Sequence, residues 1–203
     1  MGKKYIAIVS LLVILSFVGY IVYDTISSEK KEQSEKPEIS EEAVPDKWFV
    51  FNSIHVEEGN LTSVAVSGNG EVFVGGETFA SCYNPDLTKK WTLKTPAVIG
   101  AMSVYGDTLY AASTEIIYLI SMEGRLIGEW GPYEAKSIIT SVSAQRHRLA
   151  FADAGNKRIF ILKKDGEVIA MIGQAVNSII IPSPYFDVAL DGSNNLYLAN
   201  TGN

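Results

Sequence analysis

The chain has 203 residues and a formal net charge of −6 at pH 7. Because proteins that bind nucleic acids need clustered Lys and Arg to neutralise phosphates, this acidic balance argues against a nucleic-acid partner. The single cysteine, Cys82, can form neither an intrachain disulfide nor a cysteine-rich metal site. We therefore expect Cys82 to be a small buried apolar residue rather than a reactive thiol.

The N-terminal part of the chain contains an uncharged, largely apolar run from Tyr5 to Tyr23, preceded by Lys3 and Lys4. As a helix this run would span about 28 Å, close to the roughly 30 Å hydrocarbon core of a bilayer. A cleaved signal peptide and an uncleaved signal anchor both fit such a run, and the lack of a clean pair of small residues after it favours the anchor. We expect residues 1–24 to form one N-terminal transmembrane helix. The two lysines predict a cytoplasmic N-terminus, with the rest of a single-pass protein outside the cytoplasm, in the periplasm or at the cell surface.

A charged segment, residues 25–47, follows the apolar run. It consists mainly of Ser, Glu, Lys and Gln and contains Pro37 and Pro45. Such a composition offers little apolar surface to offset the entropy lost on ordering. We therefore expect a flexible stalk that holds the following domain away from the lipid surface.

Residues 48–203 are expected to form one partial propeller domain, in which residues 61–203 contain the same unit four times. The starts of its second strand, at residues 72, 109, 149 and 196, are 37, 40 and 47 residues apart. Four short strands every forty or so residues are typical of a propeller blade, and glycines such as Gly124 and Gly166 predict two-residue hairpin turns between third and fourth strands. We expect an all-β propeller with about three and a half four-stranded blades. The expected first strands are residues 62–66, 101–104, 141–144 and 187–190; the second are 72–75, 109–112, 149–152 and 196–199; the third are 79–83, 116–121 and 158–163; the fourth are 90–93, 126–129 and 168–171.

In the last two units, the turn after the second strand has the same residue pattern. The pattern is Asp or Asn, then Gly-Asn, and then a basic residue in the unit where the sequence extends that far. Its members are Asp153, Gly155, Asn156 and Arg158 in the third unit, and Asn200, Gly202 and Asn203 in the fourth. Both units resemble the NHL-repeat family, whereas Gly76 and Ser113 stand at the position of the Asp in the first two units. The resemblance implies a propeller that serves mainly as a binding platform. From their chemistry alone, we expect the Asp and Asn side chains to hold these turns by hydrogen bonds to backbone groups.

The fourth unit stops at Asn203, after its second strand. Residues 48–51 have the composition of a lone outer strand, whose partner strands are not in the sequence. We expect the chain to be C-terminally incomplete, as a fragment of a longer product. Two copies that complete a ring together are the less favoured alternative.

No catalytic, cofactor-binding or metal-binding residues are predicted. His55 and His147 have no metal-ligand partner at a useful spacing and are expected to be surface turn residues. Two classes of function remain. The favoured one is a non-catalytic binding platform for a protein, peptide or glycan, and the alternative is a propeller enzyme of the lactonase, lyase or quinoprotein kind, whose catalytic residues lie mainly in missing blades.

Overall fold

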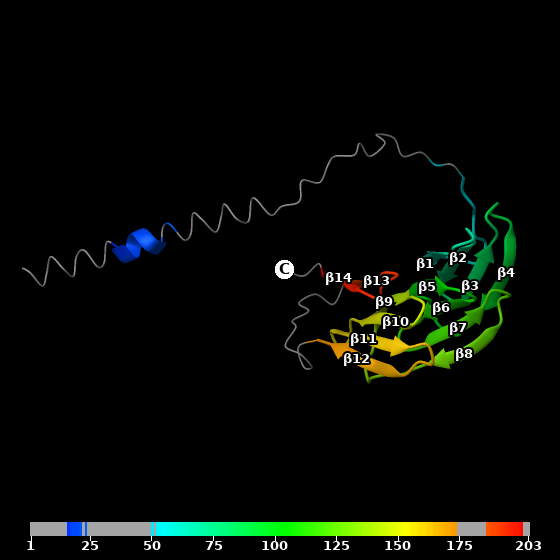
Figure 1. Ribbon diagram of the computed structural model, residues 1–203. Coiled ribbons are helices and arrows are strands. Elements are labelled where there is room, and N and C mark those ends of the chain that lie inside the picture. Colours follow the sequence, from blue (N-terminus) through cyan, green and yellow to red (C-terminus); the bar gives the residue numbers. More distant parts are fainter. Residues whose placement is uncertain (1–15, 22, 24–49, 51, 174–185, 201–203) are drawn as a thin grey trace, which may run out of the picture. The chain divides into compact units, whose positions relative to one another are not determined.

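The computed structural model describes residues 16–21, 23, 50, 52–173 and 186–200 (Figure 1). The chain divides into two compact units, Met1–Phe51 and Asn52–Asn203. In the first unit, residues 16–21 and 23 are helical. No helix within the described ranges is long and apolar enough to cross a membrane. Most of the run from Tyr5 to Tyr23 and the whole of the stalk lie outside those ranges, so the transmembrane helix and the stalk stay predictions.

The second unit is built from antiparallel sheets, as the repeat predicts. Among the described residues, three sheets have four strands and the last has two, and in each sheet the strands follow one another in chain order. The all-β architecture and the repeated four-stranded blade are thereby confirmed. The strands are β1 (Leu61–Val66), β2 (Val72–Gly76), β3 (Phe79–Tyr83) and β4 (Lys89–Lys94); β5 (Ala101–Tyr105), β6 (Thr108–Ala112), β7 (Ile117–Ser121) and β8 (Leu126–Trp130); β9 (Ile139–Ala144), β10 (Arg148–Asp153), β11 (Arg158–Lys163) and β12 (Val168–Ile172); and β13 (Phe186–Leu190) with β14 (Leu196–Asn200).

The hairpins between third and fourth strands are one residue longer than the sequence pattern suggests. In the second sheet the amide of Ser121 donates to the carbonyl of Arg125 at 2.8 Å, and the amide of Gly124 donates back to Ser121 at 2.9 Å. Three residues therefore lie between the closing pair. Gly124 has a φ of 78°, the left-handed conformation that such a loop needs at its last position.

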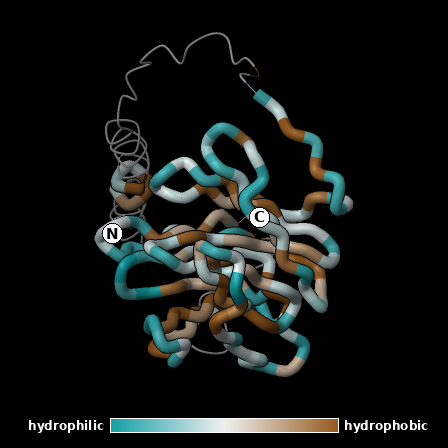
Figure 2. Tube along the Cα trace, turned by 90° about the vertical axis from the view of Figure 1, so that its right-hand side faces the viewer, coloured by the Kyte–Doolittle hydropathy of each residue, from teal (hydrophilic) through white to brown (hydrophobic). Residues whose placement is uncertain are grey.

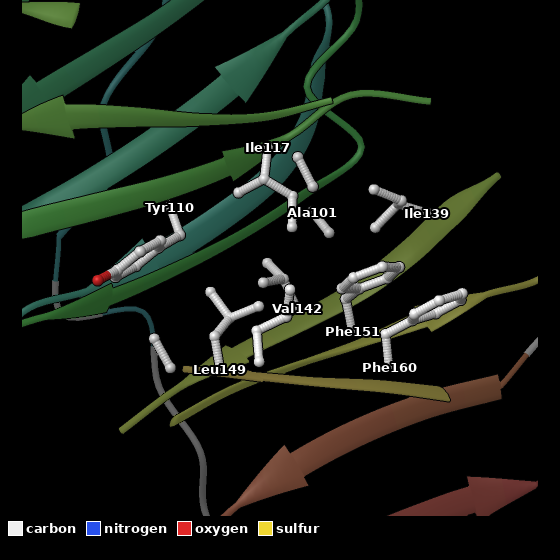
Figure 3. Close-up of a cluster of buried hydrophobic side chains, with 11 residues drawn as sticks. Ala101, Tyr110, Ile117, Ile139, Val142, Leu149, Phe151 and Phe160 are labelled. Atoms are coloured by element: carbon white, nitrogen blue, oxygen red, sulfur yellow. The ribbon is translucent and has the colours of Figure 1, made fainter. Parts of the chain in front are cut away.

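The four sheets pack face to face in chain order. Each first strand contacts the first strand of the next sheet, in the pairs β1 with β5, β5 with β9 and β9 with β13. Buried apolar side chains fill each gap between sheets, and Figure 3 shows the gap between the second and third sheets, where Phe151 and Phe160 stack at 4.7 Å between ring centroids. Hydrophilic segments lie mainly in the loops (Figure 2). Each blade is thus stabilised by apolar area that it buries against its neighbours.

Cys82 lies in the gap between the first and second sheets and is fully buried, which confirms its predicted role. Burial in this apolar cluster raises the pKa of its thiol to about 11, because the charged thiolate is disfavoured away from water. The thiol is therefore neutral and inaccessible in the folded protein.

Serine side chains on the first strands join neighbouring sheets. The Oγ of Ser103 accepts a hydrogen bond from the amide of Ala144 at 3.0 Å, and the Oγ of Ser143 accepts one from the amide of Leu190 at 2.9 Å. The two bonds connect equivalent positions at two successive gaps. These bonds give acceptors to amides on the edge of the first strand that has no neighbouring strand in its own sheet. Without an acceptor, such amides would be costly to bury.

A Ser143→Ala variant is expected to lower the free energy of unfolding by about 1–2 kcal/mol, because the amide of Leu190 loses its acceptor in a half-buried place. Urea unfolding followed by tryptophan fluorescence measures the change. The exposed Ser193→Ala variant is the matched control and should shift stability by no more than about 0.5 kcal/mol. Equal effects of the two substitutions would show that the hydrogen bond between Ser143 and the amide of Leu190 contributes nothing to stability.

Candidate functional site

The turn between β10 and β11 surrounds a fully buried carboxylate, that of Asp153. Its Oδ1 accepts hydrogen bonds from the amide of Ile138 at 2.9 Å and from the amide of Asn156 at 3.3 Å. Its Oδ2 accepts from the Oγ of Ser137 and from the Nδ2 of Asn156, both at 2.8 Å. Four donors therefore converge on one side chain, which ties the turn to the segment that leads into β9.

Asn156 and Gly155 complete this connection. The Nδ2 of Asn156 also donates to the carbonyl of Ala135 at 3.2 Å. A Cβ on Gly155 would lie only 1.9 Å from the carbonyl oxygen of Lys136, so the close approach of the two backbones requires glycine here. The turn and the segment 134–138 thus form one packed surface.

Arg158, at the start of β11, forms an ion pair with Glu134 above this surface. Both side chains are about a quarter exposed, at 25% and 27%. Together with Ala135 and Asn156 they line an open pocket of about 290 Å³. We take this pocket as the candidate site, because it places a guanidinium, a carboxylate and an amide at the surface on a firmly held turn.

The equivalent turns of the other sheets are built differently. Ser113 is buried and bonds only within its own turn among the bonds described, accepting from the amide of Ile116 and donating to its carbonyl. A Cβ at Gly76 would collide with the ring of Phe79, at 2.2 Å. Asn200 pairs with Phe186 at the end of β14, whereas Gly202 and Asn203 lie outside the described residues. The turn of the third unit is therefore distinct from the first two.

Several polar contacts at the first blade were not anticipated from the sequence. The carboxylate of Glu58 accepts hydrogen bonds from Lys89 at 2.6 Å and from Thr92 at 2.8 Å, and the bond from Lys89 lowers the pKa of Glu58. These contacts tie the segment before β1 to the outer strand β4. Because Glu58 and Lys89 lie 31 positions apart without a recognisable motif, only the folded chain reveals the pair.

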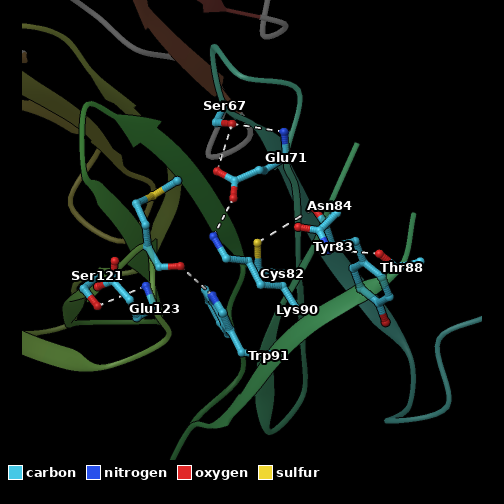
Figure 4. Close-up of polar contacts among 11 residues, drawn as sticks. Ser67, Glu71, Cys82, Tyr83, Asn84, Thr88, Lys90, Trp91, Ser121 and Glu123 are labelled. Atoms are coloured by element: carbon cyan, nitrogen blue, oxygen red, sulfur yellow. Dashed lines mark hydrogen bonds and ion pairs between the residues drawn. The ribbon is translucent and has the colours of Figure 1, made fainter. Parts of the chain in front are cut away.

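Trp91, on the outer strand β4, joins the first blade to the second (Figure 4). Its Nε1 donates to the carbonyl of Met122 at 2.9 Å, and a Cβ on Gly124 would lie 2.6 Å from its ring. Nearby, Lys90 pairs with Glu71 at 2.7 Å across the same sheet. None of these residues lines the pocket at the Arg158–Glu134 pair.

Both histidines are exposed, as predicted for surface residues. Within the part of the chain that the structure describes, no three His, Cys, Asp or Glu side chains are grouped so that they could hold a metal ion. The pocket itself offers one ion pair and an amide.

Solved structures of β-propeller proteins resemble this fold. Virginiamycin B lyase from Staphylococcus aureus aligns with a TM-score of 0.56 and 15% identity, over 69% of this chain and 48% of that protein. The computationally designed Ika4 protein aligns with a TM-score of 0.54 and 10% identity, over 74% of this chain and 96% of that protein. The WD40 domain of Pan2 from Neurospora crassa aligns with a TM-score of 0.50 and 12% identity, over 64% of this chain and 41% of that structure.

The chain thus spans less than half the length of these two natural structures. No family model and no curated protein matches the sequence, and the NHL-repeat resemblance stays a prediction. At these identities the comparisons establish a β-propeller type of fold for the second unit.

Replacing Asp153 by Ala is expected to lower the free energy of unfolding by about 3 kcal/mol, because four donors lose one buried charged acceptor. Ser113→Ala, at the equivalent position of the second sheet, is the matched control and should cost about 1 kcal/mol, since it removes only local bonds. Thermal and urea unfolding measure both variants. A D153A variant as stable as S113A would contradict the role of the buried carboxylate.

Proposed function

We propose that this protein is a membrane-tethered, extracytoplasmic binding platform whose partner is a protein or peptide segment. The observation that carries the binding role is the Arg158–Glu134 pair, which stands at the surface over a turn fixed by four hydrogen bonds to Asp153. Rigid scaffolds that present polar loop residues are the usual basis of recognition in proteins.

The chemistry of the pocket favours an acidic or backbone group of a peptide. A guanidinium presents planar donors that can pair with a carboxylate or with peptide carbonyls. Arg158 is partly exposed, so it can exchange its bond to Glu134 for one to a ligand, while the carboxylate of Glu134 accepts hydrogen bonds from neighbouring donors of the same ligand. Binding is favoured over catalysis because the residues that line the pocket include no nucleophile of the Ser, Cys or Lys type.

The membrane tether is supported by the sequence alone. The run from Tyr5 to Tyr23 has the length of a bilayer core, and Lys3 and Lys4 fit a cytoplasmic N-terminus. The charged segment 25–47 then provides reach between the lipid surface and the blades. Display outside the cytoplasm gives a platform of this kind access to partners at the periplasm or cell surface.

The tether predicts that the full chain stays with membranes after carbonate extraction, whereas a chain with Leu11→Asp and Leu15→Asp is released. Each aspartate near the centre of a spanning helix costs roughly 2.5–3.5 kcal/mol of insertion. Protease added to spheroplasts should digest the blades of the wild-type chain and leave the anchor in the membrane fraction. A blade unit protected from the protease, or a mature N-terminus near residue 24, would refute this topology.

The binding role predicts that a photoreactive amino acid at Ala135, on the pocket, captures a discrete partner in intact cells. The same amino acid at the exposed His147, at the other end of β10, is the matched control and should capture none. Arg158→Ala should abolish capture and leave the melting temperature nearly unchanged, because a partly exposed ion pair contributes only about 0–1 kcal/mol. Equal capture from both positions, or capture that persists without Arg158, would contradict the assignment of the pocket.

A further inference from the structure

Two lysines with an unusual backbone conformation adjoin the pocket at Arg158. Lys136 has a φ of 65° and Lys157 a φ of 52°, in the left-handed region that residues with a side chain rarely adopt. Lys136 directly follows Ala135, which lines the pocket. Lys157 lies between Asn156 and Arg158, which line it too. Both lysines are exposed, and their long flexible side chains give the ammonium groups reach to a ligand in the pocket.

The contact between the two backbones explains the bend at these positions, but it does not explain lysine. The carbonyl oxygen of Lys136 lies against Gly155, where a Cβ would be only 1.9 Å from it. Glycine adopts the left-handed conformation without steric cost, so it would be the easier residue at positions 136 and 157. The exposed lysine side chains bury little apolar area in return. Because strained backbone is typical of functional sites, the two positions point to a role for the ammonium groups.

Positive charge exceeds negative charge at this pocket. Lys136, Lys157 and Arg158 contribute three cations, against the partly exposed carboxylate of Glu134. The carboxylate of Asp153 is fully buried and already accepts four hydrogen bonds. The ammonium of Lys136 has no ion-pair partner among the described residues. The folded chain therefore leaves an excess of cations here that a ligand can neutralise.

The charge of this turn is reversed relative to the first two units. There the turn after the second strand carries an exposed acid, which is Glu77 in the first unit and Glu115 in the second. The third unit has Lys157 and Arg158 instead, although the chain as a whole has a net charge of −6. The basic surface therefore belongs to the same turn that Asp153 holds in place.

We propose that the pocket binds a peptide segment with two or more adjacent acidic side chains. One carboxylate pairs with the planar guanidinium of Arg158, and the others pair with the ammonium groups of Lys136 and Lys157. The inference rests on the proposed binding function and names the class of segment that the pocket recognises. Complementary charge then selects this segment among peptides and speeds its encounter with the pocket.

The carboxylate of Glu134 favours an acidic peptide over other polyanions. A peptide has backbone N–H groups between its acidic side chains, and Glu134, which lines the pocket, can accept hydrogen bonds from them. Phosphate groups of a nucleic acid and sulfate groups of a glycan are fully ionised acceptors, and Glu134 repels them at close range. The mixture of three cations and one carboxylate therefore suits a segment that offers both acids and N–H donors.

Fluorescence anisotropy with the full chain in detergent tests the inference. The probe is a fluorescein-labelled peptide with adjacent glutamates, and the comparison peptide has glutamines in their place. The wild-type chain should bind the glutamate peptide about ten times more tightly, and a Lys136→Gln and Lys157→Gln variant should lose most of that preference. An Arg146→Gln and Arg148→Gln variant, which removes exposed cations at the other end of β10, is the matched control and should keep it.

Three results would overturn the inference. The first is equal binding of the glutamate and glutamine peptides by the wild-type chain. The second is a preference that survives the loss of both lysines, or that falls as much in the control variant. The third is tighter binding of a heparin oligosaccharide than of the glutamate peptide, which would assign the surface to a sulfated glycan.

A Lys136→Gly variant separates the charge from the backbone. Because glycine relieves the left-handed conformation, its melting temperature should equal or exceed that of the wild-type chain, while its affinity for the glutamate peptide falls. A marked fall in melting temperature with unchanged affinity would overturn the inference, since Lys136 would then serve the turn itself.

Capture in intact cells by the photoreactive amino acid at Ala135 separates this inference from the proposed function. Adding Lys136→Gln and Lys157→Gln should abolish capture, and the linked segment of the partner should contain adjacent acids. A partner that is still captured without the two lysines would overturn the acidic-segment inference and leave the binding platform standing. If the glutamate peptide binds as expected but the wild-type chain captures nothing in cells, the binding function fails, whereas the chemistry of the pocket is supported.

Discussion

The blade unit depends on how the backbone amides at the free edge of each first strand find hydrogen-bond acceptors. These amides have no partner strand in their own sheet. A backbone amide buried there without an acceptor costs about 1–3 kcal/mol. Ser103 and Ser143 supply the acceptors for Ala144 and Leu190, so each sheet is aligned with the next by side chain to backbone bonds. This constraint brings the first strands close together and thereby sets which apolar residues face each other between sheets.

Small residues allow that close approach, and aromatic residues close the wider part of the gap. Ala150 and Ala152 are fully buried against the last sheet, where larger side chains would hold the strands apart. Farther out, Trp91 reaches across to the hairpin of the next blade and occupies the space beside Gly124. Neighbouring blades are thus joined by hydroxyl bridges near the first strands and by apolar packing toward the outer strands.

The repeat varies at the residue that ends or directly follows the second strand, and this variation makes the turn of the third unit different from the turns of the first two. Asp153 gathers four donors and binds the turn to the segment before β9, whereas Ser113 bonds within its turn and Gly76 makes room for Phe79. The third unit therefore presents Arg158 and Glu134 from a fixed base. A scaffold that is repetitive in its strands can in this way display a distinct surface at a single blade.

The amino-acid sequence by itself determined the blades, because hairpin glycines, alternating apolar residues and the spacing of the units are local features that specify strands and turns. It also indicated that Cys82 is buried. Only the tertiary structure decided the partners of Asp153 and Arg158, since Ser137 and Glu134 come from a connecting segment that has no motif of its own. In the same way, Val64 and Val188 occupy equivalent positions in similar strands, and one is exposed while the other is buried. Burial of such a residue depends on the neighbouring sheet, which strand patterning does not encode.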